Sequence, residues 1–194
     1  MSQPTGIILG NGGYPAAGKT GVGESECPDN NFCTPKHGQK GAQNEANAIF
    51  DRAVRCAIEQ DRPEAARLYK QAADMGHADA THNLAVCHAL GLGVEQDRPE
   101  AARLYKQAAD MGHANAIHNL AACYALGLGV DRDDDEAVKL YIKAANMGNR
   151  DSLLTLADRY KKGRGVKQDN DEADRLLRIA EETNPATKEK DQTS

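Results

Sequence analysis

The sequence predicts an all-α protein, an α/α superhelical solenoid of about four helix-turn-helix repeats of 36 residues each. Residues 59–94 return almost unchanged as residues 95–130, with only four differences between the two copies. A helix-start motif, Asp-x-x-Glu, occurs four times at the same spacing, and a Gly-x-Gly-Val loop occurs three times. A fixed period of about 20 to 50 residues is typical of solenoids, in which each repeat packs chiefly against its neighbours.

Composition and charge exclude several classes of function. The 194-residue chain has a net charge of -5 and a pI near 5.7, whereas binding to nucleic acids or anionic membranes needs clustered Lys and Arg. We therefore expect neither a nucleic acid nor a membrane as partner, and no cofactor. The N-terminal residues MSQPTGIILG lack the long apolar run of a signal peptide, and no stretch is long enough to span a bilayer. A cytoplasmic location is expected, with unconventional secretion left open.

The cysteines also favour a reducing compartment, because they are five in number and do not pair by position. Cys87 and Cys123 occupy equivalent positions in successive repeats. Their Cα atoms should lie roughly 9 to 10 Å apart, a helix-packing distance that is too long for a disulfide.

Residues 1–40 should form a flexible leader, since they contain 8 Gly and 4 Pro. Within it, Gly13–Thr20 matches the P-loop pattern GxxxxGK[ST], but no buried strand precedes the match and no helix follows it. Cys27, Cys33 and His37 are spaced more widely than typical zinc ligands, and a fourth ligand is not evident. We expect neither nucleotide nor metal binding there.

The first helix should begin near Gly41, where apolar residues start to recur three and four positions apart. It opens the first of four units, at residues 41–76, 77–112, 113–148 and 149–184, and residues 185–194 form a polar tail. The first unit lacks the glycine loop and the last ends in the polar helix Asp171–Glu182. Degenerate end units of this kind are typical of the caps of a solenoid.

The second helix of each unit should begin at a capping box, in which the Asp side chain accepts from the third helical N–H and the Glu side chain reaches back. The four boxes are Asp61/Glu64, Asp97/Glu100, Asp133/Glu136 and Asp169/Glu172. The first helix of a unit, for example Asp79–Leu90, should end at the Gly-x-Gly-Val loop. Its glycines would supply positive φ and a close approach between helices.

The unit A-x-x-x-L-A-x-x-Y-x-x-G-x-G-V, followed by D-x-x-E-A-x-x-L-Y-x-K-A-A-x-x-G, resembles the SEL-one-like repeat (SLR), a relative of the tetratricopeptide repeat. Residues Ala116 to Gly148 match it best. His88 replaces the Tyr of the first helix in one unit, and Leu68, Leu104 or Leu140 stands where the family often has Trp. The resemblance implies a right-handed α-superhelix that acts as an adaptor in multiprotein assemblies, usually without catalytic residues.

By analogy with tetratricopeptide arrays, the helix that ends at the glycine loop should line the concave face and bind the partner. The expected groove residues of the second unit are Asp79, His82, Asn83, Val86 and Leu90. The third unit would supply Asn115, His118, Asn119, Ala122 and Leu126, and the fourth Asp151, Leu154, Thr155, Asp158 and Lys162.

Asn83 and Asn119 should form a ladder, which Asn47 could extend, whose amides pair with the backbone of an extended peptide. His82 and His118 beside it could add pH sensitivity near neutrality. The alternative is that these are solvated surface residues copied by a tandem duplication.

We do not expect an enzyme, because no Cys–His pair is aligned: His118 and Cys123 should point about 140° apart on their helix. The sequence therefore predicts a protein–protein interaction scaffold or adaptor that binds a peptide or helical segment of another protein on its concave face. Two alternatives stay open. One is a β-lactam-binding or hydrolase-like protein, although the members linked to β-lactams carry paired cysteines in each unit. The other is a secreted bacterial effector with residues 1–40 as its export leader.

Overall fold

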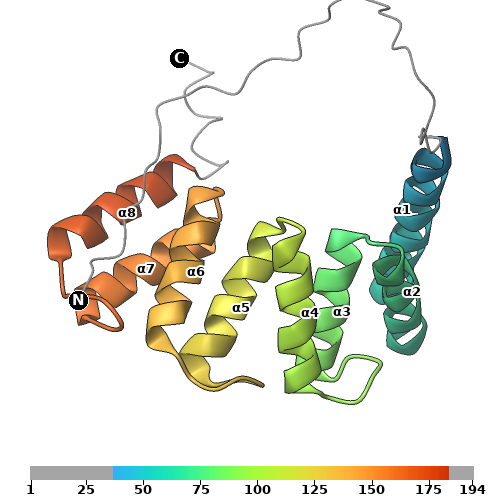
Figure 1. Cartoon of the computed structure of the whole chain (residues 1–194), viewed down its shortest axis with the longest axis horizontal. Coiled ribbons are helices and arrows are strands. Elements are labelled where there is room, and N and C mark those ends of the chain that lie inside the picture. Colours follow the sequence, from blue (N-terminus) through green and yellow to red (C-terminus); the bar gives the residue numbers. More distant parts are fainter. Residues whose placement is uncertain (1–36, 184–194) are drawn as a thin grey trace, which may run out of the picture.

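A computed structural model describes residues 37–183, with side chains from Gly41 onward. Within this range the chain forms eight α-helices and no strands, arranged side by side in chain order (Figure 1). The helices are α1 (His37–Ile58), α2 (Arg62–Asp74), α3 (Ala78–Leu90), α4 (Arg98–Asp110), α5 (Ala114–Leu126), α6 (Asp134–Asn146), α7 (Arg150–Lys162) and α8 (Asn170–Glu182). The prediction of an all-α helical solenoid is confirmed.

Several expectations lie at or beyond the edges of this range. Helix α1 begins at His37, before the predicted start at Gly41. The rest of the predicted leader and the predicted tail from residue 185 lie outside the described residues. So do the P-loop match and Cys27 and Cys33.

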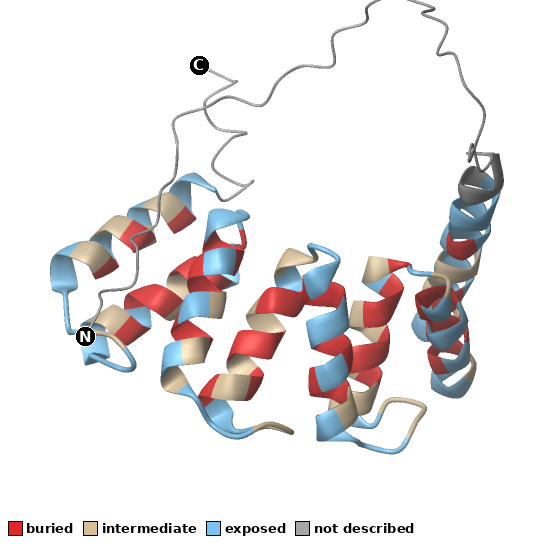
Figure 2. Cartoon of the chain, viewed as in Figure 1, coloured by how far each residue is buried: buried red, intermediate tan, exposed pale blue. Residues whose placement is uncertain are grey.

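Each helix packs against its neighbours in the chain, most extensively in the pairs α1 with α2, α3 with α4, α5 with α6 and α7 with α8. The buried residues lie on the sides where these helices meet (Figure 2). Many are alanines, and small side chains let helix axes approach closely. The largest fully buried apolar side chains are Leu68, Ile117, Leu153, Leu156 and Leu176.

The aspartate half of each predicted capping box is confirmed. The Asp61 carboxylate accepts from the N–H of Glu64 at 3.3 Å, and the other three boxes repeat this bond at 2.9 to 3.0 Å. The glutamate half of the prediction is wrong. Each of these glutamates instead pairs with the cation three residues later, in the pairs Glu64–Arg67, Glu100–Arg103, Glu136–Lys139 and Glu172–Arg175.

The reason lies in the backbone of the cap residue. The N–H of Asp97, which the glutamate was expected to bind, donates to the carbonyl of His88 on the preceding helix at 2.9 Å. Asp133 and Asp169 make the same bond to Tyr124 and Tyr160. Because this donor is already satisfied, the glutamate carboxylate is free to bind a cation on its own helix.

The second glycine of each loop packs against the start of the preceding unit's second helix. Gly93 and Gly129 have φ of +75° and +77°. A Cβ on Gly129 would overlap the carbonyl group of Arg98 at the start of α4, and one on Gly93 would overlap that of Arg62. Positive φ and close backbone approach both demand glycine here, as the sequence predicted.

The first unit differs from the others by a shorter connection. Only three residues separate Ile58 from the start of α2, whereas seven separate Leu90 from the start of α4. Phe50 accordingly takes the place of His82: Phe50 stacks on His77 with ring centroids 4.5 Å apart, as His82 stacks on His113. Asn47 therefore does not match Asn83, and it does not extend the asparagine ladder.

Candidate functional site

The predicted groove residues lie along α3, α5 and α7 and fall into two sets. The exposed set comprises Asp79, Leu90, Asn115, Leu126, Asp151, Asp158 and Lys162. The partly buried set comprises His82, Asn83, Val86, His118, Asn119, Ala122, Leu154 and Thr155. The exposed set is accessible to solvent. In the partly buried set, His82, Asn119 and His118 form contacts between successive units.

In the first three units, the first helix ends in an exposed apolar side chain. Ile58, Leu90 and Leu126 are the last residues of α1, α3 and α5, and they are 75%, 63% and 68% exposed. In α7 the last residue is Lys162. Large exposed aliphatic side chains are typical of binding surfaces when they are gathered in one region. Ile58 was missed in the sequence because the shorter connection of the first unit obscures its equivalence to Leu90.

His82 joins the two asparagines of the predicted ladder. Its Nδ1 lies 3.2 Å from Oδ1 of Asn83, and its Nε2 lies 3.1 Å from Nδ2 of Asn119. A neutral imidazole protonated at Nδ1 donates to Asn83 and accepts from Asn119, which satisfies both bonds. The structure therefore brings His82, Asn83 and Asn119 together, and part of each amide's bonding capacity is used within the array.

His118, the equivalent of His82 one unit later, contacts different partners. His118 Nδ1 lies 2.8 Å from the Ser152 hydroxyl. The Asn149 amide donates to Oδ1 of Asn115 at 2.7 Å, where the preceding unit has His113 Nε2 at 3.0 Å from Asp79 Oδ1. Asp79, Asn115 and His118 thus hold adjacent units together while retaining exposed or partly exposed atoms.

Two further histidines, His77 and His113, are the N-cap residues of α3 and α5. This role was not predicted from the sequence. His77 Nδ1 accepts from the N–H of Ala80 at 3.2 Å, and His113 Nδ1 accepts from that of Ala116 at 3.1 Å. Asn149 holds this position in the next unit. Asparagine is a common N-cap residue. Aligning His77 and His113 with Asn149 would therefore have indicated that the two histidines cap their helices.

Burial controls the protonation of the titratable groups near this surface. Burial lowers the pKa of His82, with the neighbouring His113 acting in the same direction, and it lowers the pKa of His118. Burial also raises the pKa of Tyr105 to about 12, against the effect of its hydrogen bond with Asn119. Burial therefore favours the neutral forms of His82, His118 and Tyr105.

The cysteines of this region are free thiols in the core. Cys87 and Cys123 are buried, and Cys56 is partly buried. Burial raises the pKa of Cys87 and Cys123, which disfavours the thiolate that a nucleophile needs. No group of His, Cys, Asp and Glu side chains among the described residues could hold a metal ion. None of the described helices combines the length and apolar character needed to cross a membrane.

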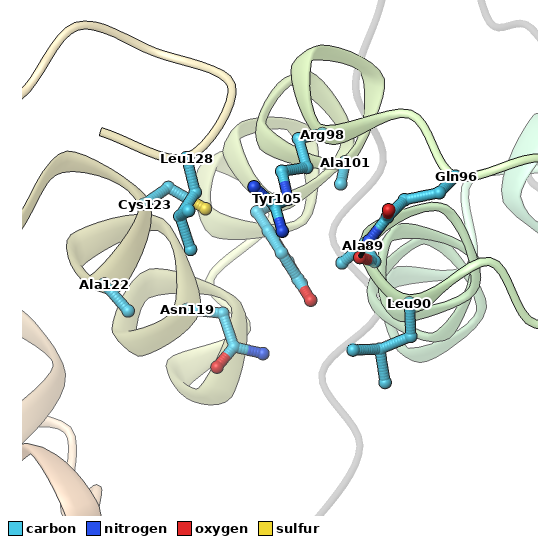
Figure 3. Close-up of a pocket in the computed structure, with 10 residues that line it drawn as sticks. All are labelled: Ala89, Leu90, Gln96, Arg98, Ala101, Tyr105, Asn119, Ala122, Cys123 and Leu128. Atoms are coloured by element: carbon cyan, nitrogen blue, oxygen red, sulfur yellow. Dashed lines mark hydrogen bonds between the residues drawn. The ribbon is translucent and has the colours of Figure 1, made fainter. Parts of the chain in front are cut away.

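An open pocket of about 250 Å³ lies where α3, α4 and α5 meet. Its lining includes Leu90, Asn119 and Ala122, three of the predicted groove residues, together with Arg98, Tyr105 and Cys123. In Figure 3 the Tyr105 hydroxyl points into the space between Asn119 and Leu90. The pocket therefore adjoins the surface that carries the exposed leucines.

Comparison of the sequence with protein families matches the Sel1 repeat over residues 55–77, 78–113, 114–149 and 151–182. No curated protein matches the chain. Among solved structures, a Sel1 repeat protein from Oxalobacter formigenes is 29% identical with a TM-score of 0.67. The alignment covers 73% of this chain and 58% of that protein.

Two further structures extend the comparison. The protective antigen c5321 of uropathogenic Escherichia coli, which displays an SLR fold, is 31% identical with a TM-score of 0.69, covering 76% of this chain and 32% of the antigen. The chain thus spans less than two thirds of either relative's length. The immunity protein Pa5087 of Pseudomonas aeruginosa, at 24% identity and a TM-score of 0.55 over 72% of this chain and 53% of its own, shares the fold alone.

The four family matches together cover more than half of the chain, and the helices and loops that they span are those described above. They confirm the resemblance that the repeated motifs indicated, and the chain belongs to the Sel1 repeat family.

Proposed function

We propose that this protein is an interaction scaffold that binds a peptide or helical segment of another protein along α3 and α5, on the concave face of its superhelix. The observation that carries the proposal is the pair of exposed leucines, Leu90 and Leu126, at equivalent positions of successive units. Sel1 repeat proteins commonly serve as protein-interaction scaffolds. Solenoids present extended surfaces on which a linear segment can contact several units at once.

The energetic roles divide between the apolar and polar residues of this surface. Full burial of a leucine side chain contributes about 1.5 to 3 kcal/mol, so covering the exposed parts of Leu90 and Leu126 would supply a useful share of a micromolar affinity. The amides of Asn83 and Asn119 would fix the register of the bound segment through bonding capacity that His82 leaves unused. The scaffold itself contributes no chemistry in this proposal, and its setting is the cytoplasm.

The test is an affinity capture from the cells that produce the protein, with variants that alter only exposed side chains. Leu90→Ser with Leu126→Ser should abolish retention of a partner that the wild type retains. The matched control is Met111→Ser with Met147→Ser, which removes two exposed apolar side chains at the C-terminal ends of α4 and α6.

The control pair should retain the partner at the wild-type level, and both pairs should unfold at the wild-type temperature. Equal loss in both pairs, or unchanged retention in the leucine pair, would remove α3 and α5 as the binding surface.

A further inference from the structure

The pocket between α3, α4 and α5 has a counterpart one unit later that is filled by the protein itself. Adding 36 to the residue numbers converts Tyr105 into Tyr141, Arg98 into Asp134 and Cys123 into Arg159. Arg159 is buried, with its guanidinium carbon 5.3 Å from the centroid of the Tyr141 ring. Its Nη1 donates to the Asp134 carboxylate at 3.1 Å. The Arg159 side chain, which packs on Tyr141 and pairs with Asp134, therefore fills the space that corresponds to the pocket.

The same space is left open between α3, α4 and α5 because Cys123 is much smaller than arginine. Ala122 enlarges it further, since the preceding unit has Val86 there. The charge beside it is also reversed, because Arg98 stands in place of Asp134. The Arg98 guanidinium makes no ion pair or hydrogen bond within residues 37–183.

The size and lining of the pocket restrict what it can hold. About 250 Å³ is below the range of roughly 300 to 1,000 Å³ that is usual for small-molecule sites, so it suits one or two side chains rather than a cofactor. Leu90, Ala122 and Leu128 offer apolar contact, and Arg98 and Asn119 offer hydrogen-bond donors. An unpaired cation above an apolar wall favours a carboxylate next to an aliphatic group.

We infer that this pocket binds an acidic residue and its aliphatic neighbour in the partner segment. The ligand carboxylate pairs with Arg98, in the place where Arg159 pairs with Asp134 one unit later but with the two charges exchanged. The aliphatic side chain packs against Leu90 and Ala122. The inference deepens the proposed function, on which it rests, by naming the chemical class of peptide that the α3 and α5 surface recognises.

The inference is tested by NMR titration of the full chain with N-acetyl-Leu-Glu-amide and with its neutral isostere N-acetyl-Leu-Gln-amide. The acidic peptide should give saturable shifts at Arg98 Nε–H and at the Asn119 side-chain amide. It should bind only about three- to fivefold more tightly than the neutral peptide, because Arg98 is exposed and the ion pair would be screened by water. The preference should shrink between low salt and high salt, as expected for an ion pair near the surface.

Two variants and a matched control sharpen the result. Arg98→Gln should reduce the preference for the acidic peptide to about one. Arg98→Asp combined with Cys123→Arg should rebuild the Arg159–Asp134 arrangement, fill the pocket and abolish the saturable shifts without loss of thermal stability. Lys106→Gln, at an exposed cation of α4 that pairs with Asp110 outside the pocket, should leave the titration unchanged.

Equal affinity for the two peptides, a preference that survives Arg98→Gln, or an absence of saturable shifts would overturn the inference. The titration needs no native partner, so its outcome is separate from that of the capture experiment. If the titration fails but the affinity capture succeeds, only the proposal for the pocket is refuted. If the capture fails but the titration succeeds, only the proposal that α3 and α5 form the wider binding surface is refuted.

Discussion

The side-chain amide of Asn119 on α5 donates to Nε2 of His82 on α3 across 3.1 Å. The other nitrogen of the same imidazole contacts Asn83, its neighbour on α3. One histidine thus connects the asparagines of two successive repeats. The bond from Asn119 requires an unprotonated Nε2, because a protonated ring can donate to Asn83 but cannot accept from Asn119. The contact between the units therefore depends on the protonation of His82.

Lowering the pH from 7.5 to 5.5 should destabilise the protein. Burial, with His113 acting in the same direction, holds the pKa of His82 below its ordinary value of 6.5, and the effect of Asp79 opposes them. Burial also lowers the pKa of His118. A histidine with a depressed folded-state pKa stabilises the fold above its unfolded pKa, and this contribution disappears as the pH falls through the folded value. The contribution of these histidines to the free energy of unfolding should therefore be complete above about pH 6.5 and decline below it.

His82→Phe provides the control for this pH dependence. Phenylalanine can stack on His113 as Phe50 stacks on His77, but it cannot bind a proton. Urea unfolding at the two pH values should show a smaller difference in midpoint for the variant than for the wild type. The same difference in both proteins would show that His82 does not carry the effect.

The glycine at position 129 should be far less replaceable than the one at position 148. Both have positive φ, but a Cβ on Gly129 would overlap the Arg98 carbonyl, whereas one on Gly148 would meet open space. We expect Gly148→Ala to cost about 1 to 2 kcal/mol and Gly129→Ala about 3 to 5 kcal/mol. Denaturant unfolding of the two variants would measure this, and similar losses would contradict the close packing of the loop.

His88→Tyr should stabilise the protein. His88 Nδ1 is buried without a hydrogen-bond partner in the protein, and tyrosine occupies the equivalent positions 124 and 160. Removing a buried unpaired nitrogen should add about 1 kcal/mol to the free energy of unfolding. The reverse change, Tyr124→His, should lower it by a similar amount. A fall in the thermal midpoint of His88→Tyr would show that the imidazole is better accommodated than its contacts indicate.

The pair of buried Arg159 and partly buried Asp134 should couple, although Asp134 also binds Arg132. Arg159→Ala removes both the ion pair and the contact with Tyr141, while Arg132 still neutralises Asp134, and we expect it to cost about 2 kcal/mol. The double variant with Asp134→Ala should cost less than the sum of the single changes by about 1 to 2 kcal/mol. Additive losses in this double-mutant cycle would mean that the two charges do not interact.

Much of the architecture could be predicted because it depends on local chemistry repeated at a fixed spacing. An aspartate cap determines where α2, α4, α6 and α8 begin, and glycines with positive φ end α3, α5 and α7. Such signals act within a few residues, so the sequence alone exposes them. The family resemblance rested on the same repeated positions.

The contacts between units could not be predicted in the same way. His82 and His118 are copies of one residue, yet His82 meets Asn119 whereas His118 meets Ser152. The next unit has Thr155 at the position of Asn119, and Ser152 at the position of Ala116. Which partner a side chain reaches depends on the offset between stacked units, which no periodicity within one unit reveals. The redirected capping glutamates and the shortened first unit escaped prediction for a different reason, because they depend on how the two helices of one unit are joined.

The most direct test of the central claim is site-specific photo-crosslinking in the cells that produce the protein. Benzoylphenylalanine would replace Leu90 or Leu126 on the proposed surface, or Met111 or Met147 as exposed apolar controls. We predict that positions 90 and 126 crosslink to the same protein, and that positions 111 and 147 do not. Crosslinks to that protein from the control positions alone, or none from 90 and 126, would contradict the assignment of α3 and α5 as the binding surface.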